Sequence, residues 1–128
     1  RLFNKKIDIQ TEIYLLHKLA ELNDLEFIKQ RATALFTKNS ENLNFELQKY
    51  IGDILSDNLE SNEFIFYCNE LFKEYKPIGL LYSIVRVYDE LGESDKAISL
   101  IEDFLNEYPQ NNELIQLYDY LIQINSIN

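Results

Sequence analysis

Apolar side chains recur at helical spacing along most of the chain and stop at glycines, prolines or polar clusters. The clearest example lies between the two prolines of the sequence, Pro77 and Pro109. Apolar residues at every third or fourth position from Leu80 to Leu91 predict a helix, and Gly92 suits the left-handed residue just past its end. A second run with the same spacing, Ala97–Tyr108, follows this turn. The segment therefore predicts a helical hairpin.

The same pattern occurs twice more, upstream of this hairpin. A shift of 33 residues places Gly52 on Val85, and a shift of 69 residues places Asn23 on Gly92. A further apolar stretch follows Pro109 and predicts one more helix over residues 113–123. We therefore expect about seven helices with short loops and no strands.

Polar residues at the predicted helix starts suggest how these helices are capped. The second helix of the third hairpin should begin beside Ser94 or Asp95, since either side chain can accept a hydrogen bond from a first-turn amide. The second helix of the middle hairpin should begin near Ser61. The acidic stretch 57–63 lacks the ligand spacing and central glycine of a calcium loop, so we expect it to join two helices and cap the second.

Composition and charge narrow the choice of partner. The chain has 128 residues, 46% of them hydrophobic, with 12 basic and 22 acidic side chains and a formal charge of −10. This composition predicts one folded domain, because a disordered acidic segment would have few apolar residues. Nucleic acid and anionic membranes are excluded as partners, since both are bound through clustered Lys and Arg. No apolar run approaches the ~20 residues of a membrane-spanning helix, so a soluble, cytoplasmic domain is favoured.

Cys68 is the single cysteine, so it cannot form an internal disulfide. It falls on an apolar helix stripe and should be buried as a small hydrophobic residue. Methionine is absent, even at position 1, so we expect the chain to be part of a longer protein.

Chemistry-bearing motifs are missing from the sequence. His17 is the only histidine, and no nucleophile elbow, zinc-binding helix, phosphate-binding loop or dinucleotide fingerprint occurs. We expect His17 to be a partly exposed surface residue. The sequence thus predicts a non-enzymatic protein without cofactor or metal.

The segment from Pro77 to Asn111 resembles the tetratricopeptide repeat family. The matching positions are the core of the first helix, the turn glycine, the core of the second helix and the closing proline: Leu81, Ile84, Tyr88, Gly92, Ala97, Ile101, Phe104 and Pro109. The middle copy keeps Gly52 at the small position where two helices approach closely, and the first copy keeps only the apolar spacing. The resemblance implies an all-α, right-handed superhelical solenoid over residues 1–128, with hairpins at about 9–42, 45–77 and 78–111 and a closing helix at 112–125.

In this family, partners bind in the concave groove, and the groove positions transfer to this sequence. The resemblance implies these partner-binding residues: His17, Glu46, Lys49, Asp53, Asp57, Tyr82, Arg86, Asp89 and Tyr120, with Gln10, Ile13, Glu21, Glu90 and Gln116 beside them. A subset of the family binds the C-terminal carboxylate of chaperone tails through Lys, Asn and Arg at groove positions. At the corresponding positions of this sequence, only Arg86 is a suitable cation. The acidic, aromatic-edged groove instead favours a basic, or mixed basic and apolar, protein segment. The alternative is that these carboxylates form a solvated face that keeps the domain soluble.

The terminal helix carries apolar residues on more than one face, from Leu114 to Ile127. One possibility is that another helix of a longer chain covers this surface. A second is that a second copy of the chain covers it, which would make a homodimer. The third is that the helix packs mostly on the helix before it. A second interpretation is thus a structural or assembly segment of a larger repeat protein. The order of Gly52-Asp53-Ile54, Tyr67 to Tyr75 and Pro77 is similar to the last repeats of bacterial lipopolysaccharide-assembly tetratricopeptide proteins. The cysteine-rich metal knuckle that ends those proteins is absent here.

Overall fold

The computed structural model describes residues 9–38 and 43–127, which form seven α-helices and no strand. In chain order the helices are α1 (Ile9–Glu21), α2 (Leu25–Lys38), α3 (Phe45–Asn58), α4 (Ser61–Phe72), α5 (Leu80–Glu90), α6 (Ser94–Glu107) and α7 (Asn112–Ile127). The all-α prediction is confirmed for these residues. Each predicted hairpin range contains two helices, although residues 39–42 of the first range lie outside the described part of the chain.

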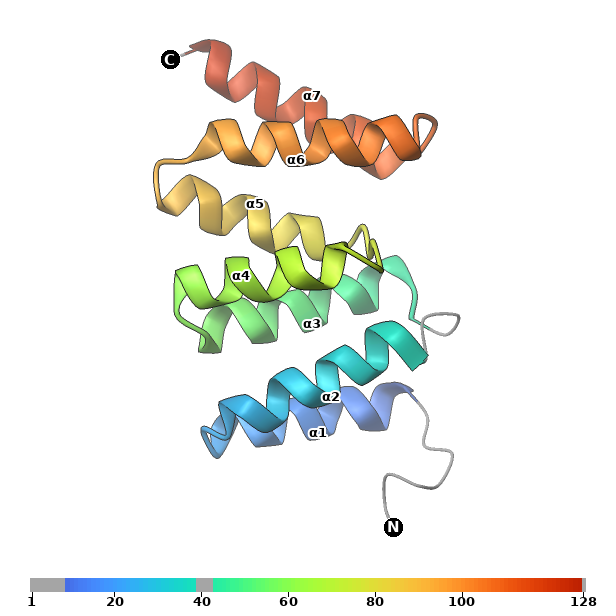
Figure 1. Ribbon diagram of the computed structural model, residues 1–128, viewed down its shortest axis with the longest axis vertical. Helices are drawn as coiled ribbons and strands as arrows, with labels where there is room; N and C mark the ends of the chain where they lie inside the picture. Colours follow the sequence, from blue (N-terminus) through green and yellow to red (C-terminus); the bar gives the residue numbers. More distant parts are fainter. Residues whose placement is uncertain (1–8, 39–42, 128) are drawn as a thin grey trace.

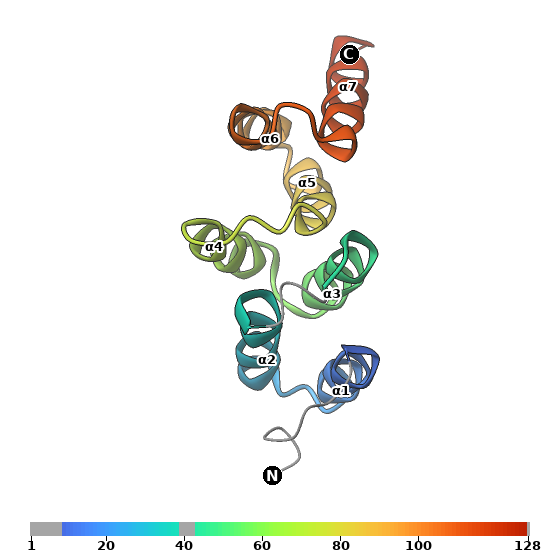
Figure 2. The ribbon, with the colours of Figure 1, turned by 90° about the vertical axis from the view of Figure 1, so that its right-hand side faces the viewer.

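The helices follow one another along the long axis of the molecule, with α1 and α7 at opposite ends (Figure 1). They alternate between two layers: α1, α3, α5 and α7 lie on one side and α2, α4 and α6 on the other (Figure 2). Helices of the same layer are therefore neighbours in space although about thirty residues separate them in the sequence.

The core lies between the two layers and is filled by the apolar stripes that the sequence predicts. Phe36, Phe64 and Phe104 are its largest buried side chains, and each comes from a helix of the α2, α4 and α6 layer. Cys68 is fully buried among them, as predicted, and this burial raises the pKa of its thiol well above the usual value.

The turns within the first and third hairpins share one backbone feature. Asn23 has φ +61° and Gly92 has φ +72°, so both residues adopt the left-handed conformation directly after a helix. Gly and Asn are the residues that reach this conformation at the lowest cost. The predicted equivalence of these two positions is confirmed.

The start of α4 is capped as the acidic stretch before it predicts. Glu60 is the N-cap residue, and its Oε1 accepts hydrogen bonds from the amides of Asn62 and Glu63 at 3.1 and 3.2 Å. Helix α4 begins at Ser61, the predicted position.

The start of α6 differs from the prediction. Neither Ser94 nor Asp95 caps it; the N-cap residue is Glu93, whose side chain makes no capping hydrogen bond. The Ser94 hydroxyl instead donates to Oδ1 of Asp89 at 3.1 Å, which links the end of α5 to the start of α6. Ser94 is itself the first residue of α6, so it lies one position past the N-cap, from which a side chain accepts a first-turn amide hydrogen bond.

Helices α3 and α5 approach each other closely at two glycines. A Cβ atom on Gly52 would lie 2.7 Å from Oγ of Ser83, and one on Gly79 would lie 2.6 Å from the carbonyl oxygen of Phe45. The Gly79 amide donates to Oε1 of Gln48 at 2.8 Å, which joins the loop before α5 to α3. The predicted role of Gly52 as the small residue at a close helix crossing is therefore confirmed.

Candidate functional site

The predicted site residues lie on the helices of one layer. His17 is on α1, Tyr120 is on α7, and the others are on α3 (Glu46, Lys49, Asp53 and Asp57) and α5 (Tyr82, Arg86 and Asp89). The structure places most of them in two adjoining groups, a polar network between α3 and α5 and a cavity between α5 and α7.

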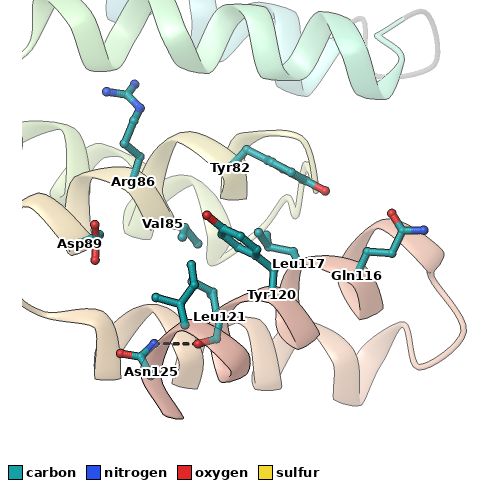
Figure 3. A pocket seen from close by; sticks show the side chains of 10 residues that line it. Tyr82, Val85, Arg86, Asp89, Gln116, Leu117, Tyr120, Leu121 and Asn125 are labelled. Carbon is teal, nitrogen blue, oxygen red and sulfur yellow. Dashed lines mark hydrogen bonds between the residues drawn. The ribbon is translucent and has the colours of Figure 1, made fainter. Parts of the chain in front are cut away.

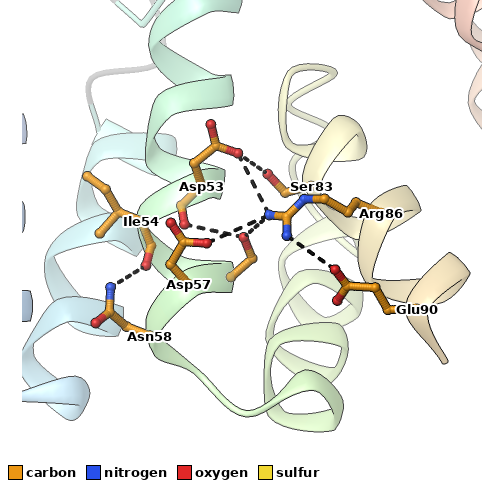
Figure 4. Close-up of polar contacts among 8 residues, drawn as sticks. Asp53, Ile54, Asp57, Asn58, Ser83, Arg86 and Glu90 are labelled. Atoms are coloured by element: carbon orange, nitrogen blue, oxygen red, sulfur yellow. Dashed lines mark hydrogen bonds and ion pairs between the residues drawn. The ribbon is translucent and has the colours of Figure 1, made fainter.

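The polar network is centred on Arg86, whose guanidinium reaches from α5 to α3 (Figure 4). Its Nη2 donates to the Ser56 hydroxyl at 2.7 Å and lies 3.9 Å from Oδ1 of Asp53 and 4.0 Å from Oδ1 of Asp57. Its Nη1 lies 3.7 Å from Oε2 of Glu90. One exposed cation is thus surrounded by three exposed carboxylates, none within close hydrogen-bond distance. The network keeps an excess of negative charge.

A second contact between α3 and α5 lies at their aromatic end. The rings of Phe45 and Tyr82 meet edge to face, with centroids 5.4 Å apart. Nζ of Lys49 lies 4.9 Å from the Tyr82 ring centroid and 5.5 Å from that of Phe45. The lysine charge is therefore held by aromatic faces.

The cavity opens between α5 and α7 and has a volume of about 410 Å³ (Figure 3). Its lining consists of Tyr82, Val85, Arg86, Asp89, Gln116, Leu117, Tyr120, Leu121, Ile124 and Asn125. Four of the predicted partner-binding residues, Tyr82, Arg86, Asp89 and Tyr120, thus meet in one cavity, together with Gln116.

The two ends of the cavity differ in character. Tyr82 and Tyr120 lie toward one end and Asp89 toward the other, while the Arg86 guanidinium is directed away from α7 (Figure 3). The Tyr82 hydroxyl donates to the carbonyl oxygen of Glu113 at 3.4 Å, and burial raises the pKa of Tyr82. An aromatic end and a carboxylate end therefore face the same opening.

The remaining predicted residues stand apart from the cavity. His17 is exposed on α1, as expected, and its ring meets that of Tyr50 edge to face at 5.9 Å. Glu46 is exposed on α3. The groove position inferred for Ile13 is wrong, because its side chain is only 3% exposed and belongs to the core between the layers.

Some residues around these groups were not among the predicted site residues. Val85, Leu117 and Leu121 line the cavity, although their helical spacing indicated only core positions. Val85 and Leu117 lie three residues from Tyr82 and Tyr120, and Leu121 lies four residues after Leu117. This spacing was the available signal, since residues three or four apart share a helix face. Ser56 was likewise detectable, because it lies three residues after Asp53 on the same helix.

Within residues 9–38 and 43–127, no three His, Cys, Asp or Glu side chains are grouped so that they could hold a metal ion. In the same ranges, none of the helices is long and apolar enough to cross a membrane. The candidate site is a cavity with an aromatic and a carboxylate end, a form that suits recognition of a ligand.

Comparison of the chain with protein-family models, with curated proteins and with solved structures finds no match.

Proposed function

We propose that this chain is a non-enzymatic protein-interaction module of the tetratricopeptide type, a right-handed superhelical solenoid that holds a protein segment on the α1, α3, α5 and α7 layer. The pairing of helices into two layers supports this architecture. The matching turns at Asn23 and Gly92 and the close crossing at Gly52 also support it.

The cavity between α5 and α7 is the observation that carries the proposal. Five positions that the resemblance assigns to the groove (Tyr82, Arg86, Asp89, Gln116 and Tyr120) line it together. They come from two helices separated in the sequence by all of α6, so their meeting depends on the stacking of successive hairpins. Concave, partly apolar sites of this kind are where proteins bind ligands.

Charge selects the partner. The groove positions on α3 and α5 carry five carboxylates and two cations: Glu46, Asp53, Asp57, Asp89 and Glu90 against Lys49 and Arg86. Both cations already have partners within the chain, Lys49 on aromatic rings and Arg86 at Ser56. The layer therefore attracts a basic, or mixed basic and apolar, segment and repels an acidic one.

A charge-reversal experiment tests the proposal. The probe is a fluorescent peptide of alternating leucine and lysine, titrated with the protein at low and high salt while its anisotropy is recorded. The variant Asp57→Lys/Asp89→Lys should bind this peptide about ten-fold more weakly at low salt, with a smaller salt dependence. The control, Asp103→Lys/Glu74→Lys, has the same net charge and changes exposed residues outside this layer. Equal affinity of the two double variants would contradict the proposal.

The second candidate function is a structural segment that assembles through α7. Ile115 and Ile122 are 38% and 39% exposed and lie seven residues apart, hence on one face of α7. A second copy of the chain docked on this face would give a homodimer. Sedimentation of the native chain and of Ile115→Ser/Ile122→Ser tests it: a native dimer and a monomeric variant are expected, and a strictly monomeric native chain contradicts it.

A further inference from the structure

The floor of the α5/α7 cavity is apolar. Val85, Leu117 and Leu121 are each less than 10% exposed and form the inner wall, and Ile124 continues it along α7. The volume of about 410 Å³ lies within the usual range of ligand pockets, roughly 300–1,000 Å³. A single large apolar side chain would therefore meet an apolar surface here.

The rim of the cavity carries an exposed aromatic ring. Tyr120 is 60% exposed and reaches from α7 toward α5 (Figure 3). Tyr82 lines the cavity from α5 and is held in place by its bond to Glu113 and by the Phe45 ring. Tyrosines offer a large contact area with few rotatable bonds, which makes them frequent anchors of interfaces.

Asp89 gives the cavity one available negative charge. Its Oδ1 accepts a hydrogen bond from Ser94, and no cationic side chain of the described residues lies within ion-pair distance of it. Arg86, three residues earlier, extends instead toward Ser56 on α3. A cation supplied from outside would therefore meet a carboxylate that the chain itself does not neutralise.

The spacing along α5 relates the apolar wall to this charge. Val85 and Asp89 are four residues apart, which is about 6 Å along a helix axis. Two residues of extended chain span about 6.6 Å. Consider an extended partner segment that lies along α5 with an apolar side chain against Val85. The residue two positions further along this segment is on the same face and lies next to Asp89.

From these observations we infer that the α5/α7 cavity is the anchor site for an aromatic or branched aliphatic side chain of a protein segment, and that Asp89 binds a lysine or arginine two positions from that side chain. This inference rests on the proposed function and adds the chemistry and spacing of the partner.

The test compares two short fluorescent peptides of the same composition. In one, a phenylalanine and a lysine lie two positions apart in a serine background; in the other they are adjacent and therefore point to opposite sides of an extended chain. The native chain should bind the first peptide about five-fold more tightly, because only it satisfies the cavity and Asp89 together. Equal affinity for both peptides would overturn the spacing.

Two pairs of variants test the anchor itself. Tyr120→Ala should weaken binding of the first peptide about ten-fold, whereas Tyr14→Ala, which removes a tyrosine of similar exposure on α1, should leave it unchanged. Asp89→Asn should weaken it about three-fold at low salt only, and Asp119→Asn, an exposed carboxylate of α7 outside the cavity lining, should not. Equal losses within either pair would overturn the inference.

A third variant covers the case in which Tyr120→Ala disturbs α7. Gln116→Trp fills the cavity from an exposed position, keeps Tyr120 and should abolish the preference between the two peptides. If the peptides bind and respond to Asp57→Lys but not to Gln116→Trp or Tyr120→Ala, the interaction module stands and the anchor site is wrong. If neither these peptides nor the leucine–lysine peptide binds, both proposals are wrong.

Discussion

The two contacts that α5 makes within its own layer are built in opposite ways. On one side, α5 lies directly against α3, with Gly52 and Gly79 at the crossing and the Ser83 hydroxyl donating to Asp53 at 3.2 Å. On the other side, α5 faces α7 across a cavity of about 410 Å³, and α7 packs mainly on α6. The contact between α3 and α5 is therefore closed, and the contact between α5 and α7 is open.

Side-chain volume accounts for the difference. The closed contact pairs Gly52 with Ser83, so the two backbones can meet. Thirty-three residues after Gly52 stands Val85, and it lines the cavity with Leu117 and Leu121. Val85 occupies the position equivalent to Gly52 in the next repeat. Its branched side chain keeps the backbones of α5 and α7 apart, whereas a glycine would let them meet. The repeat period thus determines which helices lie side by side, and the size of the side chains between them determines where a cavity remains.

The largest expected effect is at Gly79 in the closed contact. Gly79→Ala should destabilise the chain by about 3 kcal/mol, because its Cβ would overlap the Phe45 carbonyl oxygen and the Gln48 side chain. The free energy of unfolding from urea titration measures this. Gly92→Ala is the control: its φ of +72° is strained for alanine but nothing lies within 4 Å, so about 1 kcal/mol is expected. An equal loss at both glycines would remove the argument for close packing.

Gly52→Ala should cost less, about 2 kcal/mol, because its nearest neighbour is the Ser83 hydroxyl oxygen and not a backbone atom. Since Ser83→Ala removes that atom, the double variant should lose less stability than the two single losses added together. A double-mutant cycle in urea measures the coupling. Strict additivity would show that α3 and α5 do not meet at these two residues.

A substitution of Arg86 tests whether this side chain competes with a basic partner for the carboxylates of α3 and α5. Arg86→Ala removes the cation that the chain places among Asp53, Asp57 and Glu90. The affinity for the leucine–lysine peptide should rise about three-fold at low salt, since these carboxylates become available. Arg86→Lys keeps the charge and should leave the affinity near the native value. A weaker complex with Arg86→Ala would instead make Arg86 a direct contact of the partner.

The smallest expected effect is in the open contact. Val85→Ile adds one methylene group at the cavity wall, so the free energy of unfolding should change by no more than about 0.5 kcal/mol. The same urea titration measures it beside Gly52→Ala. A loss as large as that of Gly52→Ala would mean that α5 and α7 are packed as tightly as α3 and α5.

The sequence predicted the helices well because their signals are local. Apolar periodicity and the punctuation at Gly92 and Pro109 depend on neighbouring residues, and so does the start of α4 at Ser61. The predicted cap of α6 was wrong because the helix begins at Ser94 itself and Glu93 takes the N-cap position, and apolar periodicity does not fix the first residue of a helix. The cavity was only partly predictable: its polar residues follow from the repeat register, but its depth depends on the spacing of two helices that periodicity does not fix.

Because the single thiol is buried, its reaction with a thiol reagent can report on the opening of the core. Cys68 is the only cysteine in the sequence and has no accessible surface, so a thiol reagent can reach it only when α4 separates from the core. The rate of labelling therefore measures how often the molecule opens at its centre. Ligand at the α5/α7 cavity should slow that rate if the whole stack opens as one unit, and leave it unchanged if α4 opens independently.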